Sequence, residues 1–569
     1  MWEHTNKEFS WYYSRQVNIA HEAIDRHAEN PASARRNCLV CAQGRRTTRI
    51  TYGRMRLLSN KLGNVLLKHG AQKGDRVFLY LPRIPELYIA MAGCAKIGAV
   101  IVPLYTNYRE KAVKERMLDA QASLLITTPR YGERILEGAF PSLKKIIIVG
   151  AEPFYTRSNS VLWDVEMEDA SDVLECEWVP PDCPFLMVYT AGQNGKPVGL
   201  MYCHDAMRGY LATARMVLDV TDGDVLWTQA RPGWLLNVVY SAFAPWLCGI
   251  ESFVTGEINS AQALYRAIDE HHVTILYTLP RIYRMIAAAD TTTAQKHNLR
   301  HLRHLVSVLE PLTPDVLYAV MRILGLTVHD TWWTAETGMI SIANFPCLPV
   351  KPGYMGKPCP GMRAAIMDSA GHEAEPFSMG QLALKTGWPS MMMGTWEQGK
   401  LRREDARAAP WFLSGDTAFV DQDGYFFHQG SAEAGNTIIT STGKVGIREI
   451  EDVIMMHPAV REVGAIPVCD NNKKKSVKAF VSLKGGNRPG DMLKKSIRRF
   501  VEERMSPEGV PEEVVFCKTL PKDSCGKVRR IVLKAWELGL PMGNMEDLCI
   551  VNDAISDYGK ALLTDEKKA

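Results

Sequence analysis

Along much of this chain, short apolar runs alternate with segments of helical spacing, and this alternation limits the possible folds most strongly. Four of the runs cover residues 76–82, 99–104, 123–128 and 145–150, and β-branched residues are frequent in them. Apolar runs without a polar alternation are typical of strands that are buried on both faces of a parallel sheet. The pattern therefore predicts an α/β fold in which helices connect parallel strands.

The stretch 305–333 shows one strand–helix–strand unit in full. Its first strand is predicted at 305–308 and its second at 326–333. Between them, Thr313 can cap a helix, an apolar stripe follows at helical spacing, and Gly325 ends the helix. Ligands of such sheets bind beyond the carboxyl ends of the strands, so a binding site is expected there.

The length and a change of pattern toward the C-terminus predict more than one domain. A chain of 569 residues is too long for a single ordinary core. Residues 419–430 are predicted to form a hairpin, and the small, polar stretch 431–436 follows it. We therefore expect a large N-terminal domain over 1–430, a hinge at 431–436 and a smaller α+β domain over 437–569.

Composition narrows the class of protein and its partners. With 46% hydrophobic and 23% charged residues, the chain has the composition of a soluble globular protein. A net charge of +4 over this length does not indicate a nucleic-acid-binding protein. The sequence has no apolar run of about 18 residues, so no membrane span is expected. The 13 cysteines lack the spacing of a secreted domain and the N-terminus lacks a signal pattern, which predicts a cytoplasmic location.

The segment 188–200 carries two glycines and a lysine in a pattern that suits phosphate. Gly192 and Gly195 let the backbone approach phosphate oxygens closely, and Lys196 adds a positive charge. A Walker loop is excluded, because it needs four residues between its glycines and a Ser or Thr after its lysine. Taken alone, the segment is either a phosphate loop or an ordinary turn.

Three further motifs follow along the chain, at 330–338, 414–430 and 520–530. Together with 188–200 they resemble the acyl-adenylate-forming superfamily, and the Thr-Trp-Trp at 331–333 is similar to that of AMP-forming acetyl-CoA synthetases. The resemblance implies a large α/β N-terminal adenylate-forming domain with layered sheets and helices, and a small α+β C-terminal lid that rotates between two steps. In the first step a carboxylate reacts with ATP to give acyl-AMP and pyrophosphate, and in the second coenzyme A takes the acyl group. ATP, Mg²⁺ and coenzyme A are thus the expected substrates and ion, with no prosthetic group.

The resemblance also implies roles for individual residues. Lys527 and Lys196 are the expected catalytic residues, with Lys527 contacting the carboxylate and the α-phosphate. Glu336 is expected near the magnesium ion, and Asp416 at the ribose hydroxyls. The other expected ATP or AMP contacts are Thr190, Gly192, Gly195, Glu310, Pro311, Asp330, Thr331 and Trp332.

For the acyl group, the resemblance implies a small pocket. Trp333 matches the tryptophan that closes the pocket in acetate enzymes, and its wide indole leaves room for only one or two carbons. Leu235, Leu236 and Val308 match the other walls. Acetate or another short carboxylate is therefore the expected substrate.

The phosphate side departs from the family pattern. Ala191, Gln193 and Asn194 replace a serine and two threonines of the phosphate loop, and Leu309 replaces a glycine that lies against adenine. The stretch 431–436 lacks the arginine of the family's hinge. We expect these changes to weaken nucleotide binding relative to typical members.

The coenzyme side departs as well. Ser441 and Thr442, the expected coenzyme A contacts, replace a Ser-Gly pair, and Glu502 falls near the place of an arginine that meets the coenzyme's 3′-phosphate. Three hypotheses stay open: an acetyl-CoA-synthetase-like ligase, a non-catalytic or regulatory nucleotide- or acyl-CoA-binding homologue, and an adenylating enzyme with another acyl acceptor. The expected partners are small molecules rather than nucleic acid or a membrane, and the oligomeric state is left open.

Overall fold

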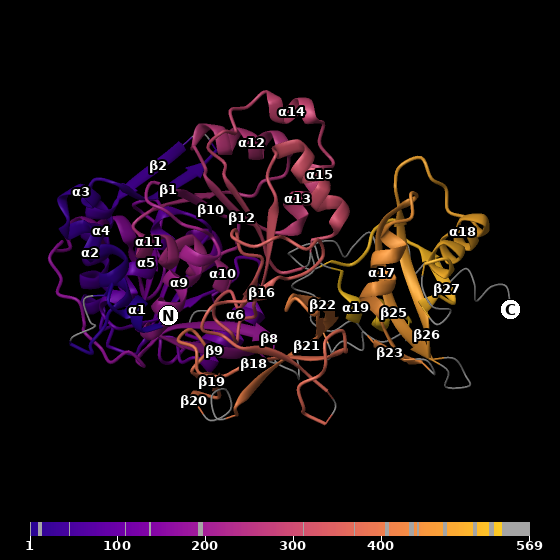
Figure 1. The fold of residues 1–569 in the computed structure, drawn as a ribbon. Helices are drawn as coiled ribbons and strands as arrows, with labels where there is room; N and C mark the ends of the chain where they lie inside the picture. The colour runs from indigo at the N-terminus through magenta and orange to yellow at the C-terminus, as the bar shows by residue number, and fades with distance from the viewer. Residues whose placement is uncertain are drawn as a thin grey trace. The chain divides into compact units, whose positions relative to one another are not determined.

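The computed structural model describes residues 2–537 except 10–13, 45, 109, 136–137, 192–196, 311, 369, 404–408, 432–436, 441–442, 470–474, 505–508 and 523–527. Contacts divide the chain into two compact units (Figure 1). Unit 1 comprises Met1–Ala364 and Leu384–Phe412, and unit 2 comprises Ala365–Ala383 and Leu413–Ala569. Nearly all of the hinge predicted at 431–436 lies outside the described residues, so that hinge and the domain boundaries beside it stay predictions.

The first sheet of unit 1 has nine strands in the order β16-β15-β14-β13-β12-β10-β11-β1-β2. Its strands are β1 (Asn37–Gln43), β2 (Arg46–Thr51), β10 (Val225–Thr228), β11 (Glu251–Thr255), β12 (Ile275–Thr278), β13 (His304–Ser307), β14 (Val328–Trp332), β15 (Ile342–Ala343) and β16 (Lys357–Pro358). The six strands from β14 to β1 are parallel to one another, whereas β15 and β2 pair with the two ends of this group in the antiparallel direction. The parallel strands predicted at 305–308 and 326–333 are confirmed as β13 and β14.

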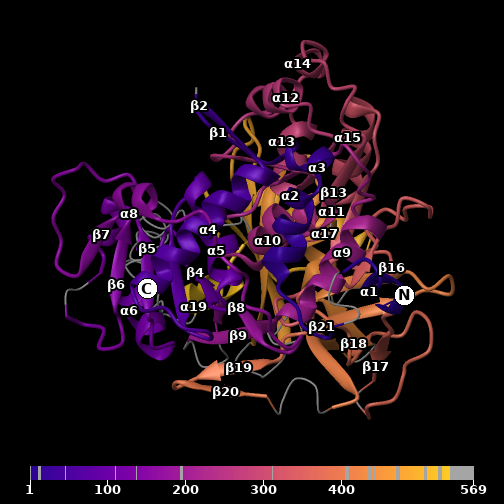
Figure 2. The same ribbon diagram turned by 90° about the vertical axis from the view of Figure 1, so that its left-hand side faces the viewer.

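The second sheet of unit 1 also has nine strands, in the order β20-β19-β9-β8-β4-β3-β5-β6-β7 (Figure 2). Its strands are β3 (Arg76–Tyr80), β4 (Val100–Pro103), β5 (Leu124–Thr127), β6 (Lys145–Ile148), β7 (Ser160–Leu162), β8 (Pro184–Ala191), β9 (Pro197–Cys203), β19 (Gly394–Glu397) and β20 (Lys400–Arg402). The four apolar runs of the sequence form β3, β4, β5 and β6, which pair in parallel. The prediction of parallel strands there is confirmed.

Helices connect and cover the strands of unit 1. They are α1 (Trp2–Asn6), η2 (His21–Asp25), α2 (Arg26–Glu29), α3 (Pro31–Ala34), α4 (Tyr52–Lys68), α5 (Pro85–Lys96), α6 (Glu110–Asp119), α7 (Pro129–Gly132), α8 (Trp163–Asp169), η3 (His204–Ala206), α9 (Met207–Met216), α10 (Leu235–Val238), η4 (Val239–Phe243), α11 (Ala244–Cys248), α12 (Ala261–Glu270), α13 (Pro280–Ala287), α14 (Thr291–Gln295) and α15 (Pro314–Leu324). The predicted helix is α15: Thr313 is its N-cap residue but makes no side-chain cap hydrogen bond, and Gly325 ends it in the left-handed region.

The core of the first sheet shows why α15 packs where it does. Leu276, Leu305 and Val328 lie in one row across β12, β13 and β14, since they are register partners. This row belongs to one buried cluster with apolar residues of α12, α13 and α15. Because strand residues alternate between faces, the next residues on the same face follow two positions later, at the carboxyl ends of these strands.

Unit 2 contains antiparallel strands and an α+β part. Three strands lie mostly in unit 2, and the unit boundaries fall within them: β17 (Ala364–Met367), β18 (Gly380–Lys385) and β21 (Trp411–Val420). Its other strands are β22 (Phe426–Ser431), β23 (Thr437–Thr440), β24 (Gly443–Gly446), β25 (Val460–Cys469), β26 (Lys475–Leu483) and β27 (Glu513–Phe516), and its helices are α17 (Ile447–Met455), α18 (Asp491–Glu502) and α19 (Arg530–Glu537). The hairpin predicted at 419–430 is confirmed by the pairing of β21 with β22. Apolar residues of α17 and α18 pack on β25 and β26 as a separate core.

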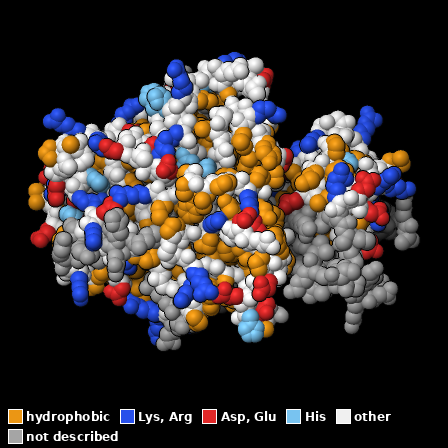
Figure 3. Space-filling view, in the orientation of Figure 1, with side chains coloured by type: hydrophobic (Ala, Val, Ile, Leu, Met, Phe, Trp, Pro, Cys, Tyr) orange, Lys and Arg blue, Asp and Glu red, His pale blue; other side chains and the backbone are white. Residues whose placement is uncertain are grey.

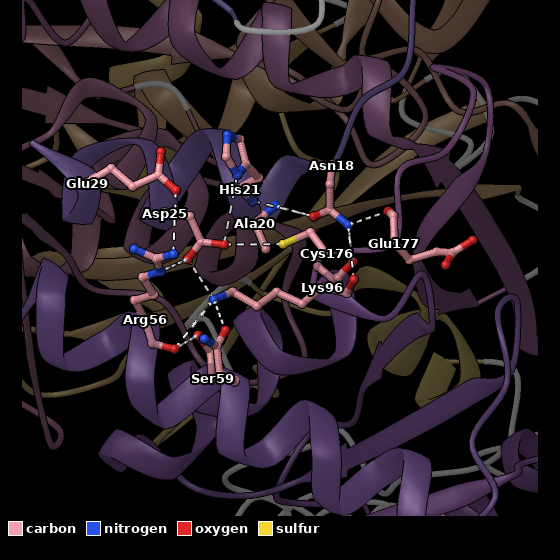
Figure 4. A network of polar contacts seen from close by, with 12 residues as sticks. Asn18, Ala20, His21, Asp25, Glu29, Arg56, Ser59, Lys96, Cys176 and Glu177 are labelled. Atoms are coloured by element: carbon pink, nitrogen blue, oxygen red, sulfur yellow. Dashed lines mark hydrogen bonds and ion pairs between the residues drawn. The ribbon is translucent and has the colours of Figure 1, made fainter. Parts of the chain in front are cut away.

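A buried ion pair fastens the N-terminal segment to the rest of unit 1 (Figure 4). The Lys96 side chain is fully buried, and its ammonium donates to Asp25 at 2.6 Å and to Asn60 at 2.5 Å. The other carboxylate oxygen of Asp25 accepts from the Cys176 thiol at 3.2 Å. One ligand atom each of His21, Asp25 and Cys176 lies within 4.8 Å of the others, but the buried ammonium beside Asp25 would repel a metal cation. The electrostatics therefore favour a structural ion pair here.

Candidate active site

The candidate site is built at the carboxyl ends of β12, β13 and β14. Thr278 pairs with Ser307, and Ser307 with Asp330, so these three side chains form a row across the sheet. The buried hydroxyls of Thr278, Ser307 and Thr334 have no hydrogen-bond partner within the described part of the chain. Buried polar groups without a partner are costly. This end of the sheet therefore fits water or a polar ligand, as predicted for the ends of these strands.

Two of the expected nucleotide contacts already have protein partners. The Asp330 carboxylate accepts the Leu312 amide at 2.9 Å and so ties the loop after β13 to β14. The Glu310 carboxylate accepts from the guanidinium of Arg284, on α13, at 2.8 Å. Their expected nucleotide roles stay predictions, and Pro311, between them, lies outside the described residues.

Leu309 has the backbone conformation of a glycine. Its φ is +88°, which L residues rarely adopt, and the residue is 46% exposed. Hydrophobic side chains also gather over α15 in Figure 3, where Tyr318 is exposed. The loop thus keeps the shape that the family's glycine allows while it carries a leucine.

We expect Leu309→Gly to bind AMP roughly 5-fold more tightly, which corresponds to about 1 kcal/mol. The substitution removes an exposed side chain from the face that the resemblance places against adenine, and it relieves the positive φ. Calorimetric titration with AMP measures the change. Leu309→Ala is the matched control, since it removes the bulk of the side chain but keeps a Cβ at positive φ. If AMP binds no more tightly to either variant than to the wild type, Leu309 does not obstruct the base.

Trp333, the expected floor of the acyl pocket, directly follows β14, and Tyr277 and Thr331 lie on the opposite face of the same strands from Thr278 and Asp330. The indole Nε1–H of Trp333 donates to the Tyr277 hydroxyl at 3.0 Å, and that hydroxyl lies 3.0 Å from the Thr331 hydroxyl. The Thr331 hydroxyl donates to the Ser307 carbonyl at 2.6 Å. Burial raises the pKa of the Tyr277 phenol, so the hydroxyl stays protonated and can donate. Trp333 and Thr331 are thus joined through one tyrosine.

The other expected pocket residues lie on neighbouring elements. Leu235 and Leu236 are buried in α10, which continues into η4, and the Tyr240 ring of η4 meets the Trp333 indole edge-on. Val308 is buried directly after β13, and its amide donates to the Thr278 carbonyl. The fold places these residues on elements around the end of β14, and their role as pocket walls stays a prediction.

A tight turn follows β14 and presents Glu336. The Met392 amide donates to the Glu336 carbonyl, and the Tyr202 hydroxyl donates to the Ala335 carbonyl at 2.5 Å. Gly338 has φ +74°, and a Cβ there would lie 1.8 Å from the Ser390 carbonyl oxygen, so only glycine fits. Among the described residues the Glu336 carboxylate has no ion-pair partner. One free carboxylate suits Mg²⁺, which proteins usually hold through one or two carboxylates together with substrate phosphates.

The loop that resembles a phosphate loop connects β8 and β9. Thr190 pairs with Val198 near the end of this hairpin. Gly192, Gly195 and Lys196 lie outside the described residues, so their expected phosphate contacts stay predictions. The described strands on either side, β8 and β9, pair in the antiparallel direction.

In unit 2, Asp416 has a neighbour that the sequence did not single out. The Nε2 atom of His428, on β22, lies 3.2 Å from the Asp416 carboxylate on β21. The predicted hairpin was the only feature of the sequence that could have indicated this contact, since the pairing of its two strands brings His428 close to Asp416. Glu502 is the last residue of α18. Lys527, Ser441 and Thr442 fall in segments that the structure does not describe.

Two arginines missed by the sequence reasoning line a cavity of about 350 Å³. Arg83 follows β3 and Arg231 follows β10, and Gln43 and Glu257 at the ends of β1 and β11 also line it. Burial lowers the pKa of Arg83, and Arg231 lies 3.4 Å from Glu257. Only the nearness of Arg231 to Leu235, four residues further along the chain, could have indicated from the sequence that this arginine lies near the site. Two guanidinium groups beside an opening can bind an anion.

The comparisons with known proteins decide the family. The model of the AMP-binding enzyme family matches residues 24–396, and the model of its C-terminal domain matches residues 449–527. The chain belongs to the AMP-binding enzyme family. The resemblance inferred from the motifs is confirmed.

Relatives of this AMP-binding enzyme match over nearly their whole length. The acetyl-coenzyme A synthetase of Bacillus subtilis (strain 168) is 40% identical, over 96% of this chain and 97% of the relative. That of Methanothrix soehngenii is 31% identical, over 95% of this chain and 85% of the relative.

Solved structures confirm the fold class. A crystal structure of an anthranilate CoA ligase in complex with anthranoyl-AMP has a TM-score of 0.82 at 24% identity, covering 92% of this chain and 98% of that one. The acyl-CoA synthetase of Brucella canis has a TM-score of 0.71 at 27% identity, covering 92% and 95%. The prediction of a large N-terminal adenylate-forming domain followed by a smaller C-terminal domain is confirmed.

Proposed function

We propose that this AMP-binding enzyme is an AMP-forming acyl-CoA ligase of the acetyl-CoA synthetase type, which activates acetate or another short carboxylate. Nearly full-length similarity to proteins named acetyl-coenzyme A synthetase supports the reaction class. The observation that carries the choice of a short acid is the position of Trp333, which Tyr240 and Tyr277 hold at the end of β14. A wide indole fixed there leaves little depth for an acyl chain.

In the first step, a carboxylate oxygen of the substrate attacks the α-phosphorus of ATP, and pyrophosphate leaves. We assign to Lys527 the contact with the carboxylate and the α-phosphate, and to Lys196 a contact with the phosphates. Bound Mg²⁺, held by Glu336, would neutralise charge on the phosphate oxygens. Asp330 keeps the loop after β13 in place, and Thr331 and Trp332 lie beside it on β14.

In the second step, the thiol of coenzyme A gives its proton to solvent and its sulfur attacks the acyl carbon, and AMP leaves with the electrons of the broken C–O bond. We assign the path of the pantetheine arm to Ser441 and Thr442. The ribose of the nucleotide is assigned to Asp416, whose carboxylate can accept two hydrogen bonds. A lid formed by residues 437–569 would rotate about a hinge at 431–436 between the two steps, so that the enzyme passes from acyl-AMP formation to transfer of the acyl group to coenzyme A.

The remaining proposals concern partners and location. ATP, a carboxylate and coenzyme A are the small-molecule partners, and the mild net charge of +4 supports the proposal that no nucleic acid binds. In the described residues no helix is long and apolar enough to cross a membrane. The ten cysteines whose state the structure describes are free thiols, which supports the proposed cytoplasmic location.

We expect the purified protein to release pyrophosphate from ATP slowly but measurably when acetate and Mg²⁺ are present, and to form acetyl-CoA when coenzyme A is added. The altered loop and hinge are the reason for the low rate. A coupled pyrophosphate assay and chromatography of the thioester measure the two products. Pyrophosphate without any thioester would indicate another acyl acceptor. If the folded protein released no pyrophosphate with any short acid, the ligase proposal would be wrong and the binding-protein hypothesis would stand.

A further inference from the structure

The indole of Trp333 is held from two directions. Its Nε1–H donates to the Tyr277 hydroxyl at 3.0 Å, and the Tyr240 ring meets it edge-on at 76°, with the ring centroids 5.6 Å apart. The ring contact limits the tilt of the indole, and the hydrogen bond limits its rotation in its own plane. The two contacts together define a single orientation.

Tyr240 is itself fixed, so it gives the indole a rigid wall. It is fully buried, and its hydroxyl accepts from the Ile340 amide at 3.0 Å. The Thr213 hydroxyl, 2.9 Å away, donates to the Gly209 carbonyl and so is left to accept from Tyr240. The hydrogen bond from Trp333 to Tyr277 then fixes the orientation of the indole, within its own plane, against the Tyr240 ring.

The chemistry of the partners sets the direction of each hydrogen bond at Tyr277. An indole N–H can only donate, so the Tyr277 oxygen accepts from Trp333. The Thr331 hydroxyl donates to a backbone carbonyl, so its oxygen accepts the Tyr277 proton. Tyr277 thus accepts from one neighbour and donates to the other, and phenylalanine could do neither.

We propose that Tyr277 is a positioning residue that sets the acyl chain length by holding the Trp333 indole across the acyl pocket. This inference rests on the proposed ligase function and on the expected role of Trp333 as the pocket floor. Without the hydroxyl, the half-buried indole N–H has to turn toward another acceptor or toward water, because leaving it unpaired is costly. The turned indole no longer closes the pocket, and longer acids enter.

The effect should be confined to the acyl side. In Tyr277→Phe the ring remains, and with it the edge-on contact to Tyr240 at a centroid distance of 5.4 Å. Thr331 loses a donor but keeps its own hydrogen bond to the Ser307 carbonyl, so the nucleotide side of β14 stays in place. KM for the carboxylate should therefore change while KM for ATP does not.

The kinetic test compares Tyr277→Phe with Tyr283→Phe. Tyr283 is a matched control, since it is also fully buried and its hydroxyl donates to the Val306 carbonyl at 2.9 Å, away from Trp333. We expect the ratio of kcat/KM for acetate to that for butyrate to fall by about tenfold in Tyr277→Phe, the scale on which a pocket discriminates methylenes. In Tyr283→Phe the ratio should stay at the wild-type value. An equal change in both variants, or in neither, would overturn the proposal.

A second readout works without catalysis. The protein is labelled with 5-fluorotryptophan, and the ¹⁹F resonance of Trp333 is assigned from its loss in Trp333→Phe. This resonance should shift in Tyr277→Phe and remain unchanged in Tyr283→Phe. If the Trp333 resonance is unchanged in both variants, Tyr277 does not orient the indole. If the resonance shifts in Tyr277→Phe but the ratio of kcat/KM for acetate to that for butyrate does not change, Tyr277 does not set the acyl chain length. Absence of pyrophosphate release in the wild type would count against the ligase function instead, and the ¹⁹F spectrum would still report on Tyr277.

Discussion

Replacing Lys527 by alanine is expected to reduce carboxylate-dependent pyrophosphate release by roughly 10²–10³-fold, which would leave no measurable rate from an already slow enzyme. The expected role of its ammonium is to neutralise charge that grows on the carboxylate and the α-phosphate in the transition state. Such a contact contributes more to the transition state than to the bound substrates. The rate of pyrophosphate release at saturating acetate and ATP is the measurement.

Lys518→Ala is the control for this prediction. Lys518 stands nine residues before Lys527, and it is exposed and has no ion-pair partner in the part of unit 2 that the structure describes. The substitution Lys518→Ala removes the same charge from the same region of the chain, and the rate of pyrophosphate release should stay at the wild-type level. If both variants lost activity equally, the loss would reflect the charge or stability of unit 2 rather than the chemistry of Lys527.

Replacing Lys96 by methionine is expected to lower the free energy of unfolding of unit 1 by about 3–5 kcal/mol. The substitution keeps the length of the side chain but leaves the Asp25 carboxylate, which is nearly buried, without its ammonium partner (Figure 4). Removing one member of a buried pair leaves a charge in a medium that solvates it poorly, and the Arg56 guanidinium, 4.0 Å from the carboxylate and 40% exposed, compensates that charge only weakly. Guanidinium denaturation followed by tryptophan fluorescence measures the change.

Two comparisons make this stability prediction specific. Lys73→Met removes a half-exposed ion pair with Glu177, which should cost at most about 1 kcal/mol. The double variant Lys96→Met, Asp25→Leu removes both buried charges, so it should lose less stability than Lys96→Met alone. A loss in Lys96→Met no larger than in Lys73→Met would show that the buried pair contributes little.

The sequence by itself determined the α/β class, several strands and the family. Apolar runs such as 145–150 are typical of strands that are buried on both faces, and Gly325 can end a helix in the left-handed region, because these properties depend on residues close together in the chain. The motifs at 188–200 and 330–338 were informative for a related reason. The residue types in these motifs are those that the chemistry of phosphate and carboxylate groups requires, and this requirement does not depend on the rest of the fold.

Only the tertiary structure decided which of these residues meet. Lys96 pairs with Asp25 across 71 positions of the chain, and Trp333 reaches Tyr277 across 56. Such contacts depend on strand order, on register and on the packing of helices against the sheets, and no local pattern carries that information. The same holds for Leu309: the sequence showed a leucine in the place of a glycine, but only the structure shows that this leucine adopts a positive φ in the loop after β13.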